Sequence, residues 1–265
     1  MASFRELFRS SDGPVLGTFV KIPALEMAEI LGEAGFDFVV IDTEHALLSV
    51  RDVYSLVVVY SRMGVAPLVR ITDHGYGDAQ RYLDAGAAGV LVPHVSNGRQ
   101  AEATMRQLLF PPEGTRGMGY ASRAGLWGAL PGGPAEYVRA GRDEVARIAM
   151  VEEAESVEDL PAILAAAGVD AIFVGPGDLS LSLGVPATSP VVHEAVTRSI
   201  GAAVEAGVPV GTVVQGADQI RLRAEQGCSF LLVGNDTGLF GSAARTATAT
   251  ARTALAELTA AATTR

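Results

Sequence analysis

Short runs of apolar residues alternate with longer amphipathic stretches along almost the whole chain, and this alternation predicts the secondary structure. Eight of the short runs are continuously apolar instead of alternating with polar residues, which is typical of parallel strands buried on both faces. We expect strands at 15–21, 36–42, 67–71, 89–94, 147–152, 171–174, 208–214 and 230–234.

Helical patterns fill most of the intervals, at 24–34, 50–62, 78–85, 98–108, 157–167, 191–206, 218–226 and 243–258. Four of these end in a glycine just before the next strand, which favours left-handed C-caps at Gly35, Gly86, Gly207 and Gly227. Eight strand–helix units predict an α/β fold of the (β/α)₈ TIM-barrel type. A doubly wound open sheet is the alternative, but eight near-equal repeats favour closure.

The interval 110–145 breaks this rhythm with many glycines and prolines and the chain's one tryptophan, Trp127. Loops of this length are usually functional or disordered, so this one is expected to reach over the barrel rim or into a subunit contact. An Ala- and Thr-rich tail follows at 243–265, either as a helix packed on a neighbour or as a frayed end. No composition shift marks a boundary, so 1–265 is treated as a single domain.

Composition narrows the function classes. A net charge of −10 argues against a nucleic-acid partner or an anionic membrane surface. A single cysteine, Cys228, excludes an internal disulfide framework and fits a reducing, cytoplasmic setting. The N-terminal stretch 1–14 is not that of a signal peptide, and no apolar run reaches the roughly 18 residues of a membrane span.

Acidic residues end two neighbouring predicted strands. Glu152 ends the fifth, and Asp178 follows the sixth on a glycine-rich turn before a helix start. Catalytic groups of barrel enzymes sit at the C-terminal ends of the strands, so these carboxylates could converge. Two carboxylates that leave the other coordination positions to water suit a hard cation such as Mg²⁺ or Mn²⁺. The alternative is that each is an ordinary helix N-cap or loop salt bridge.

The second strand ends at Asp42, Glu44 and His45, and the third ends at Arg70. A carboxylate beside an imidazole fixes its tautomer and raises its basicity, so His45 is a candidate base, with His94 as a competitor. A histidine satisfied by a local loop hydrogen bond is the other interpretation. Arg70 could stabilise charge that develops on an oxygen, or it could form a structural ion pair with one of the acids.

Segments along nearly the whole chain resemble the HpcH/HpaI family of metal-dependent (class II) pyruvate aldolases, which is related to 4-hydroxy-2-oxoheptanedioate aldolase. The resemblance rests on GTF at 17–19, AGFDFVVIDTEH at 34–45, PLVR at 67–70, LVP at 91–93, FPPEGTRG at 110–117, VE at 151–152, FVGPGDLS at 173–180 and VGNDT at 233–237. It implies a barrel of the phosphoenolpyruvate/pyruvate superfamily type, and a hexamer built as a trimer of dimers that exchange a C-terminal helix.

The resemblance also implies roles for individual residues. Glu152 and Asp178 match ligands of a divalent cation, Mg²⁺ or Mn²⁺ with Co²⁺ as a third candidate. His45 matches the base, and Arg70 matches the residue that stabilises the enolate. Two acids match groups that tune the histidine: Asp42 and, from a neighbouring subunit, Asp84. The backbone N–H groups of two residues match those that bind the pyruvate carboxylate, namely Gly177 and Asp178.

One position departs from the family pattern. Met150 stands where the family usually carries a substrate-contacting glutamine, and a thioether cannot donate a hydrogen bond. The substrate could be posed differently, or water could supply the lost contact.

The resemblance implies a carbon–carbon lyase that cleaves a 4-hydroxy-2-oxo acid reversibly to pyruvate and an aldehyde through a pyruvate enolate. The alternatives are a 2-oxo acid decarboxylase of the oxaloacetate type, a biosynthetic enzyme that forms C–C bonds through the same enolate, and a non-catalytic barrel. The expected partners are a small 2-oxo acid and an aldehyde.

Overall fold

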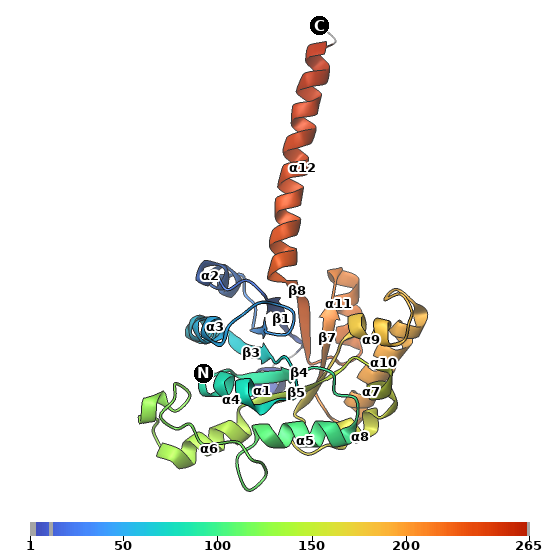
Figure 1. Cartoon of the computed structure of the whole chain (residues 1–265). Helices are drawn as coiled ribbons and strands as arrows, with labels where there is room; N and C mark the ends of the chain where they lie inside the picture. Colours follow the sequence, from blue (N-terminus) through green and yellow to red (C-terminus); the bar gives the residue numbers. More distant parts are fainter. Residues whose placement is uncertain (1–3, 11–12, 264–265) are drawn as a thin grey trace.

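Eight parallel strands close into a barrel in chain order in the computed structural model, which describes residues 4–10 and 13–263 (Figure 1). This confirms the (β/α)₈ prediction and excludes the open sheet. The strands are β1 Val15–Val20, β2 Phe38–Asp42, β3 Ala66–Arg70, β4 Gly89–Val92, β5 Ala146–Val151, β6 Ala171–Val174, β7 Val210–Val214 and β8 Phe230–Asn235.

The described residues form twelve α-helices, most of which surround the barrel (Figure 1). They are α1 Phe4–Ser10, α2 Leu25–Glu33, α3 Val50–Met63, α4 Tyr76–Asp84, α5 Gly98–Leu108, α6 Gly133–Asp143, α7 Ala154–Glu158, α8 Leu160–Ala165, α9 Pro176–Ser182, α10 Pro190–Glu205, α11 Gly216–Glu225 and α12 Asp236–Thr263. The four predicted C-cap glycines all have positive φ, between 69° and 92°. The helix expected at 157–167 is divided into α7 and α8, because Pro161 in the first turn of α8 has no N–H to continue α7.

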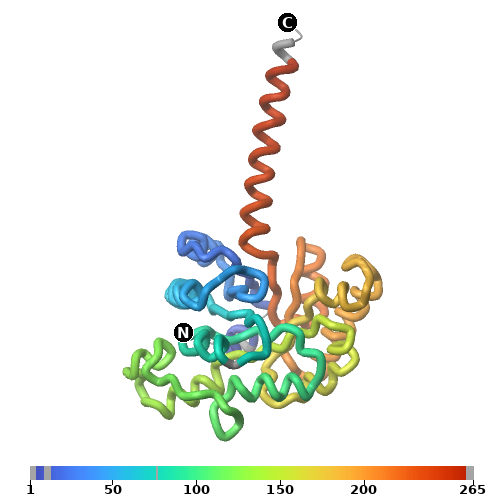
Figure 2. The backbone as a smooth tube through the Cα atoms, in the orientation of Figure 1, coloured from blue at the N-terminus to red at the C-terminus, as the bar shows by residue number. Residues whose placement is uncertain are grey.

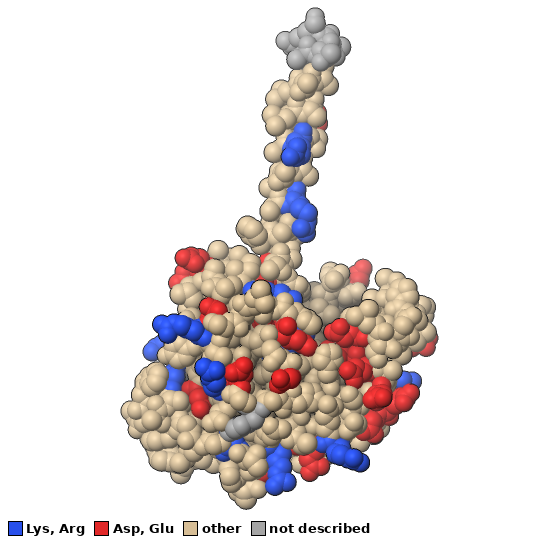
Figure 3. All heavy atoms as spheres, viewed as in Figure 1, with Lys and Arg blue, Asp and Glu red and all other residues tan. Residues whose placement is uncertain are grey.

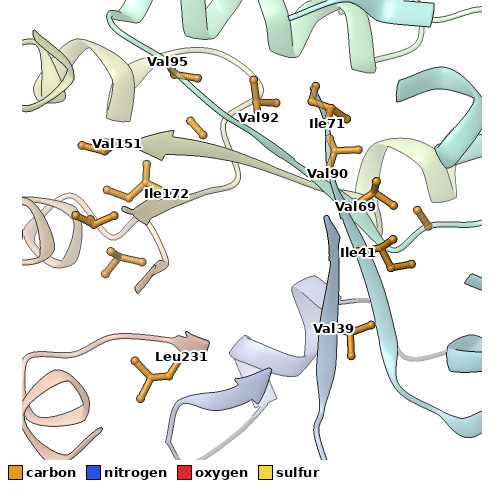
Figure 4. Close-up of a cluster of buried hydrophobic side chains, with 14 of the residues drawn as sticks. Val39, Ile41, Val69, Ile71, Val90, Val92, Val95, Val151, Ile172 and Leu231 are labelled. Atoms are coloured by element: carbon orange, nitrogen blue, oxygen red, sulfur yellow. The ribbon is translucent and has the colours of Figure 1, made fainter. Parts of the chain in front are cut away.

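Two apolar layers hold the barrel together. Side chains that leave the strands outwards pack under the helices, as Figure 4 shows for Val39, Ile41 and Val69. The alternate residues of the same strands, such as Val40 and Leu68, fill the barrel interior. Because successive side chains of a strand point to opposite faces, this alternation also fixes which residues beyond the strand ends point into the barrel mouth.

Helix α1 closes the N-terminal end of the barrel. The ring of Phe4 is fully buried and lies against Phe38 and Phe230, at the first residues of β2 and β8, with ring centroids 4.8 and 5.4 Å away. The opposite, C-terminal end of the strands is therefore the end that can admit a substrate.

Two segments lie outside the strand–helix repeat. The interval between α5 and β5 contains a short 3₁₀ turn, Leu126–Gly128, and the helix α6. Helix α12 projects away from the barrel as a single long rod (Figure 2). Its exposed apolar side chains include Leu239, Phe240, Leu255 and Leu258. None of the described helices combines the length and the apolarity that crossing a membrane requires.

Candidate active site

Three charged residues stand in a row across the first three strands. Asp42 ends β2 directly opposite Arg70 of β3, and Lys21 follows β1 beside Asp42. Arg70 donates from Nε to Asp42 Oδ1 at 3.0 Å and from Nη2 to Oδ2 at 2.8 Å, while Lys21 Nζ lies 3.1 Å from the same Oδ2. Strand register therefore places two cations and one carboxylate at the mouth of the barrel.

Arg70 is held on three sides. Besides the fork to Asp42, its Nη1 lies 3.0 Å from Glu44 Oε2, and its guanidinium stands 4.9 Å above the ring of Phe19. The side chain is only 7% exposed. A planar cation fixed in this way can stabilise negative charge on an oxygen without first reorganising.

Asp42 organises the loop that follows β2. It is fully buried and accepts hydrogen bonds from the backbone N–H groups of Glu44 and His45, at 3.2 and 3.1 Å. Burial alone would raise the pKa of this carboxyl, but the hydrogen bonds and charge of Arg70, with help from Lys21, bring it below its usual value. Asp42 is therefore an anion that positions His45 through the backbone.

Glu152 follows β5 and is 1% exposed. Its Oε1 accepts the backbone N–H of His94 at 2.8 Å, but its buried Oε2 has no hydrogen-bond partner among the described residues. A Cβ at Gly175 would lie 2.8 Å from that oxygen, so the glycine leaves the space that the carboxylate occupies. Burial raises the pKa of Glu152 to about 7, and nearby Asp178 and Glu44 add to the rise.

A divalent cation fits this environment. Asp178 lies half-buried in the first turn of α9, which follows β6, the strand next to β5. A buried carboxylate with an orphaned oxygen and a second carboxylate nearby is the oxygen-rich setting that Mg²⁺ or Mn²⁺ prefers. Among the described residues, no three His, Cys, Asp or Glu side chains form a metal-binding group.

The two candidate histidines have different surroundings. His94 Nε2 lies 3.2 Å from Glu44 Oε1, and its Nδ1 lies 3.1 Å from Glu153 Oε1. Burial lowers the pKa of His94, but Glu152, Glu44 and Glu153 outweigh it and raise that pKa. Its backbone has φ 52°, in the left-handed region that a non-glycine residue seldom adopts, and its N–H donates to Glu152.

His45 is half-exposed, and its Nε2 lies 3.9 Å from Glu44 Oε2. Both histidines thus approach Glu44, one from each side, and His45 is the freer of the two.

The other predicted site residues lie in three places. Met150 points into the barrel one layer below Glu152, where it is 1% exposed and packs in the interior core. Gly177 lies beside Asp178 in the first turn of α9. Asp84 ends α4 near the opposite end of the barrel, where Arg116 Nη2 and the Tyr137 hydroxyl donate to its Oδ1 at 3.0 and 2.9 Å. Within one chain Asp84 therefore does not meet His45.

Two residues of this site, Glu44 and Lys21, have contacts that the sequence did not predict. Glu44 joins Arg70 to both histidines, and the signal for it was its position within the strand-end run at 42–45. Lys21 was recognised as a strand end, but its contact with Asp42 depends on β1 and β2 being neighbours in the right register.

Comparisons with known proteins identify a family and several relatives. The family model described as HpcH/HpaI aldolase/citrate lyase matches residues 16–243. A 2-dehydro-3,6-dideoxy-6-sulfogluconate aldolase from Pseudomonas putida is 34% identical, over 86% of this chain and 89% of its own. A 4-hydroxy-2-oxo-heptane-1,7-dioate aldolase from Escherichia coli is 32% identical, over 87% and 88% of the two chains. A solved HpcH/HpaI aldolase/citrate lyase family structure from Burkholderia cenocepacia J2315 has a TM-score of 0.88 at 32% identity and covers 95% of this chain and 100% of its own.

Proposed function

This chain belongs to the HpcH/HpaI aldolase/citrate lyase family, and we propose that it is a divalent-metal-dependent lyase that cleaves a 4-hydroxy-2-oxo acid reversibly into pyruvate and an aldehyde. One observation carries the proposal: the buried carboxylate Glu152, whose Oε2 has no hydrogen-bond partner among the described residues, is connected through His94 and Glu44 to the buried cation Arg70. The two aldolases at 34% and 32% identity support the same reaction class.

The residues that would hold the cation are Glu152 and Asp178, and the candidate ions are Mg²⁺, Mn²⁺ and Co²⁺. The bound ion would supply a Lewis acid that polarises the 2-oxo group of the substrate. In the first turn of α9, the backbone N–H groups of Gly177 and Asp178 would bind the carboxylate of the 2-oxo acid. Met150, packed one layer below Glu152, would form the apolar floor under the reacting carbons.

Arg70 would bind the oxygen that becomes negative when the enolate forms. Its guanidinium is already fixed by Asp42 and Glu44, so little free energy is needed to orient it during the reaction. Glu44 and Asp42 would share this positioning task.

His45 would act as the base in the cleavage direction. It takes the proton of the 4-hydroxyl group, the C3–C4 bond breaks, the aldehyde carbonyl forms, and the electron pair of the broken bond passes into the pyruvate enolate. Protonation of the enolate at C3 then gives pyruvate. His45 is half-exposed and its loop is tied to Asp42, which supports a mobile imidazole on a fixed backbone.

A second copy of the chain would complete the site. We expect a hexamer, a trimer of dimers in which the exposed helix α12 is exchanged between subunits and Asp84 of a neighbour approaches His45. On the face shown in Figure 3, α12 is mostly uncharged, which supports burial against a partner. A cytoplasmic location is part of the proposal and rests on the single cysteine, Cys228, which is free and buried.

A screen of aldehydes with pyruvate and Mn²⁺ or Mg²⁺ tests the proposal. Consumption of pyruvate with formation of a 4-hydroxy-2-oxo acid is the expected result. Metal-dependent loss of CO₂ from oxaloacetate without any aldol product would instead indicate the decarboxylase.

A further inference from the structure

Lys21 is the only lysine in the chain; all other residues among its 20 lysines and arginines are arginines. Lysine and arginine side chains are not equivalent as cations. The ammonium of lysine is a compact point charge with three donors on a flexible stem, whereas the guanidinium is a planar fork suited to paired contacts. The one place where this chain carries the compact cation is the mouth of the barrel.

The backbone fixes where Lys21 stands. Val15, Gly17 and Phe19 of β1 face the barrel interior, so the period of two directs Lys21 inwards as well. The N–H groups of Lys21 and Ile22 both donate to Asp236 Oδ2, at 2.9 and 2.8 Å. Because Asp236 is only 1% exposed, the start of the Lys21 side chain is held firmly.

Among the described residues, the three donors of the Lys21 ammonium have one side-chain partner. That partner is Asp42 Oδ2 at 3.1 Å, an oxygen that already accepts from Arg70 Nη2 at 2.8 Å. The Lys21 side chain is 24% exposed, at the open mouth of the barrel. Arg70 makes two hydrogen bonds to the Asp42 carboxylate and also pairs with Glu44, so Lys21 is a second cation at this carboxylate and the one on the β1 side of the mouth.

We propose that Lys21 binds an anionic group on the aldehyde half of the substrate, so that the preferred aldehydes are short and carry a carboxylate. The inference rests on the proposed lyase function. Lys21 and Arg70 contact the same oxygen, so they are neighbours, and an anion bound by Lys21 lies only a few bonds from the ketone oxygen assigned to Arg70. Glu152 follows β5 and Asp178 lies in α9, whereas Lys21 follows β1, so the carboxylate of the 2-oxo acid and the anionic group of the aldehyde would be bound at different positions around the barrel mouth.

A purely structural role for Lys21, through Asp42, would affect all aldehydes alike. The test therefore compares two aldehydes of the same carbon skeleton, glyoxylate and glycolaldehyde, as acceptors for pyruvate. The measured quantity is the ratio of their kcat/KM values in wild type, Lys21→Met and Lys21→Arg, with folding checked by circular dichroism. Arg81→Met removes a cation exposed on α4 and serves as the matched control.

We expect wild type to favour glyoxylate. Because a hydrogen bond to a charged group is lost, Lys21→Met should lower the ratio by about 10- to 100-fold. Lys21→Arg should keep most of the preference, and Arg81→Met all of it. An equal loss on both aldehydes in Lys21→Met, or an unchanged ratio, would overturn the inference. If wild type consumed neither aldehyde, the proposed function itself would fail, and that outcome is distinct from turnover without anion preference.

The single lysine permits a second measurement. Wild-type protein with its metal is incubated with pyruvate and borohydride, and its intact mass is recorded. The proposal predicts no adduct at Lys21, because the ammonium binds an anion and does not attack a carbonyl. A reduced pyruvyl adduct at Lys21 would make this residue a nucleophile and overturn the assignment.

Discussion

Arg70 and Asp42 form two parallel hydrogen bonds across neighbouring strands, at 3.0 and 2.8 Å, at the point where both strands end. The pair makes the mouth of the barrel rigid where charge is expected to develop. It also leaves one carboxylate, Asp42, with five donors, since Lys21 and the backbone N–H groups of two loop residues bind it too.

Asp42→Asn should destabilise the fold by about 3 kcal/mol at pH 7, because it removes one partner of a buried ion pair. The folded-state pKa of Asp42 is lowered, so its contribution is present above the unfolded-state pKa of about 4 and is lost as the pH falls through the folded-state pKa. The difference between wild type and variant should therefore shrink in acid.

Urea unfolding at pH 7 and pH 3 measures this difference. Asp78→Asn removes an exposed partner of Arg81 and should cost less than about 1 kcal/mol at either pH. A difference between wild type and Asp42→Asn that grew in acid would contradict the assignment of Asp42 as a stabilising anion.

His45→Ala should slow aldol cleavage by about 10²- to 10⁴-fold and leave much of any oxaloacetate decarboxylation intact. Cleavage must remove a hydroxyl proton, whereas loss of CO₂ gives the same enolate without one. Arg70→Ala should depress both reactions, because each places charge on the ketone oxygen. The two reactions are assayed side by side on purified variants. Equal effects of His45→Ala on both would point to His94 as the base.

Most of the fold could be predicted from the sequence because the strands are apolar on both sides and four helices end in glycine. Every predicted strand overlaps an observed one, and each differs by no more than two residues at either end. Helix α1 was missed because its apolar residues are few and mixed with charges. Helix α6 was missed because glycines and prolines surround it, and α12 begins at Asp236 and not at 243.

The candidate site was predictable only in part. Strand ends identified Asp42, Arg70 and Glu152, since position along a strand is a local property. The contacts that connect them depend on which strands are neighbours and on loop shape. Glu44 lies in the loop after β2 and His94 in the loop after β4. The periodicity of the sequence does not predict that these two loops, and hence the two side chains, come into contact.

Cys228 should be unreactive in the folded protein. Burial raises the pKa of its thiol to about 11, so at pH 8 only roughly 10⁻³ of it is thiolate. A thiol-specific chromogenic disulfide should label it only after urea is added. Rapid stoichiometric labelling without urea would mean that the thiol is accessible.

Replacing Leu255 and Leu258 of α12 by glutamate should weaken assembly while the barrel stays folded. Both side chains are about two-thirds exposed in a single chain, at 64% and 68%, and are expected to be buried against a partner. Sedimentation velocity at micromolar concentration measures the effect, with Glu257→Gln as the control on the same stretch. A monomeric wild type would contradict the proposal that Asp84 of a neighbouring subunit approaches His45.

The most direct test of the central claim is pyruvate release from a 4-hydroxy-2-oxo acid, measured with Mn²⁺, after chelation, and with Glu152→Gln and Asp178→Asn. Calorimetry of Mn²⁺ binding to the same proteins accompanies the assay, and Glu155→Gln, an exposed acid on α7, is the control. We predict that chelation and both site variants reduce turnover roughly 10³-fold and that the variants bind Mn²⁺ at least about 10-fold more weakly. Full turnover by the chelated enzyme, or by Glu152→Gln, would contradict the account.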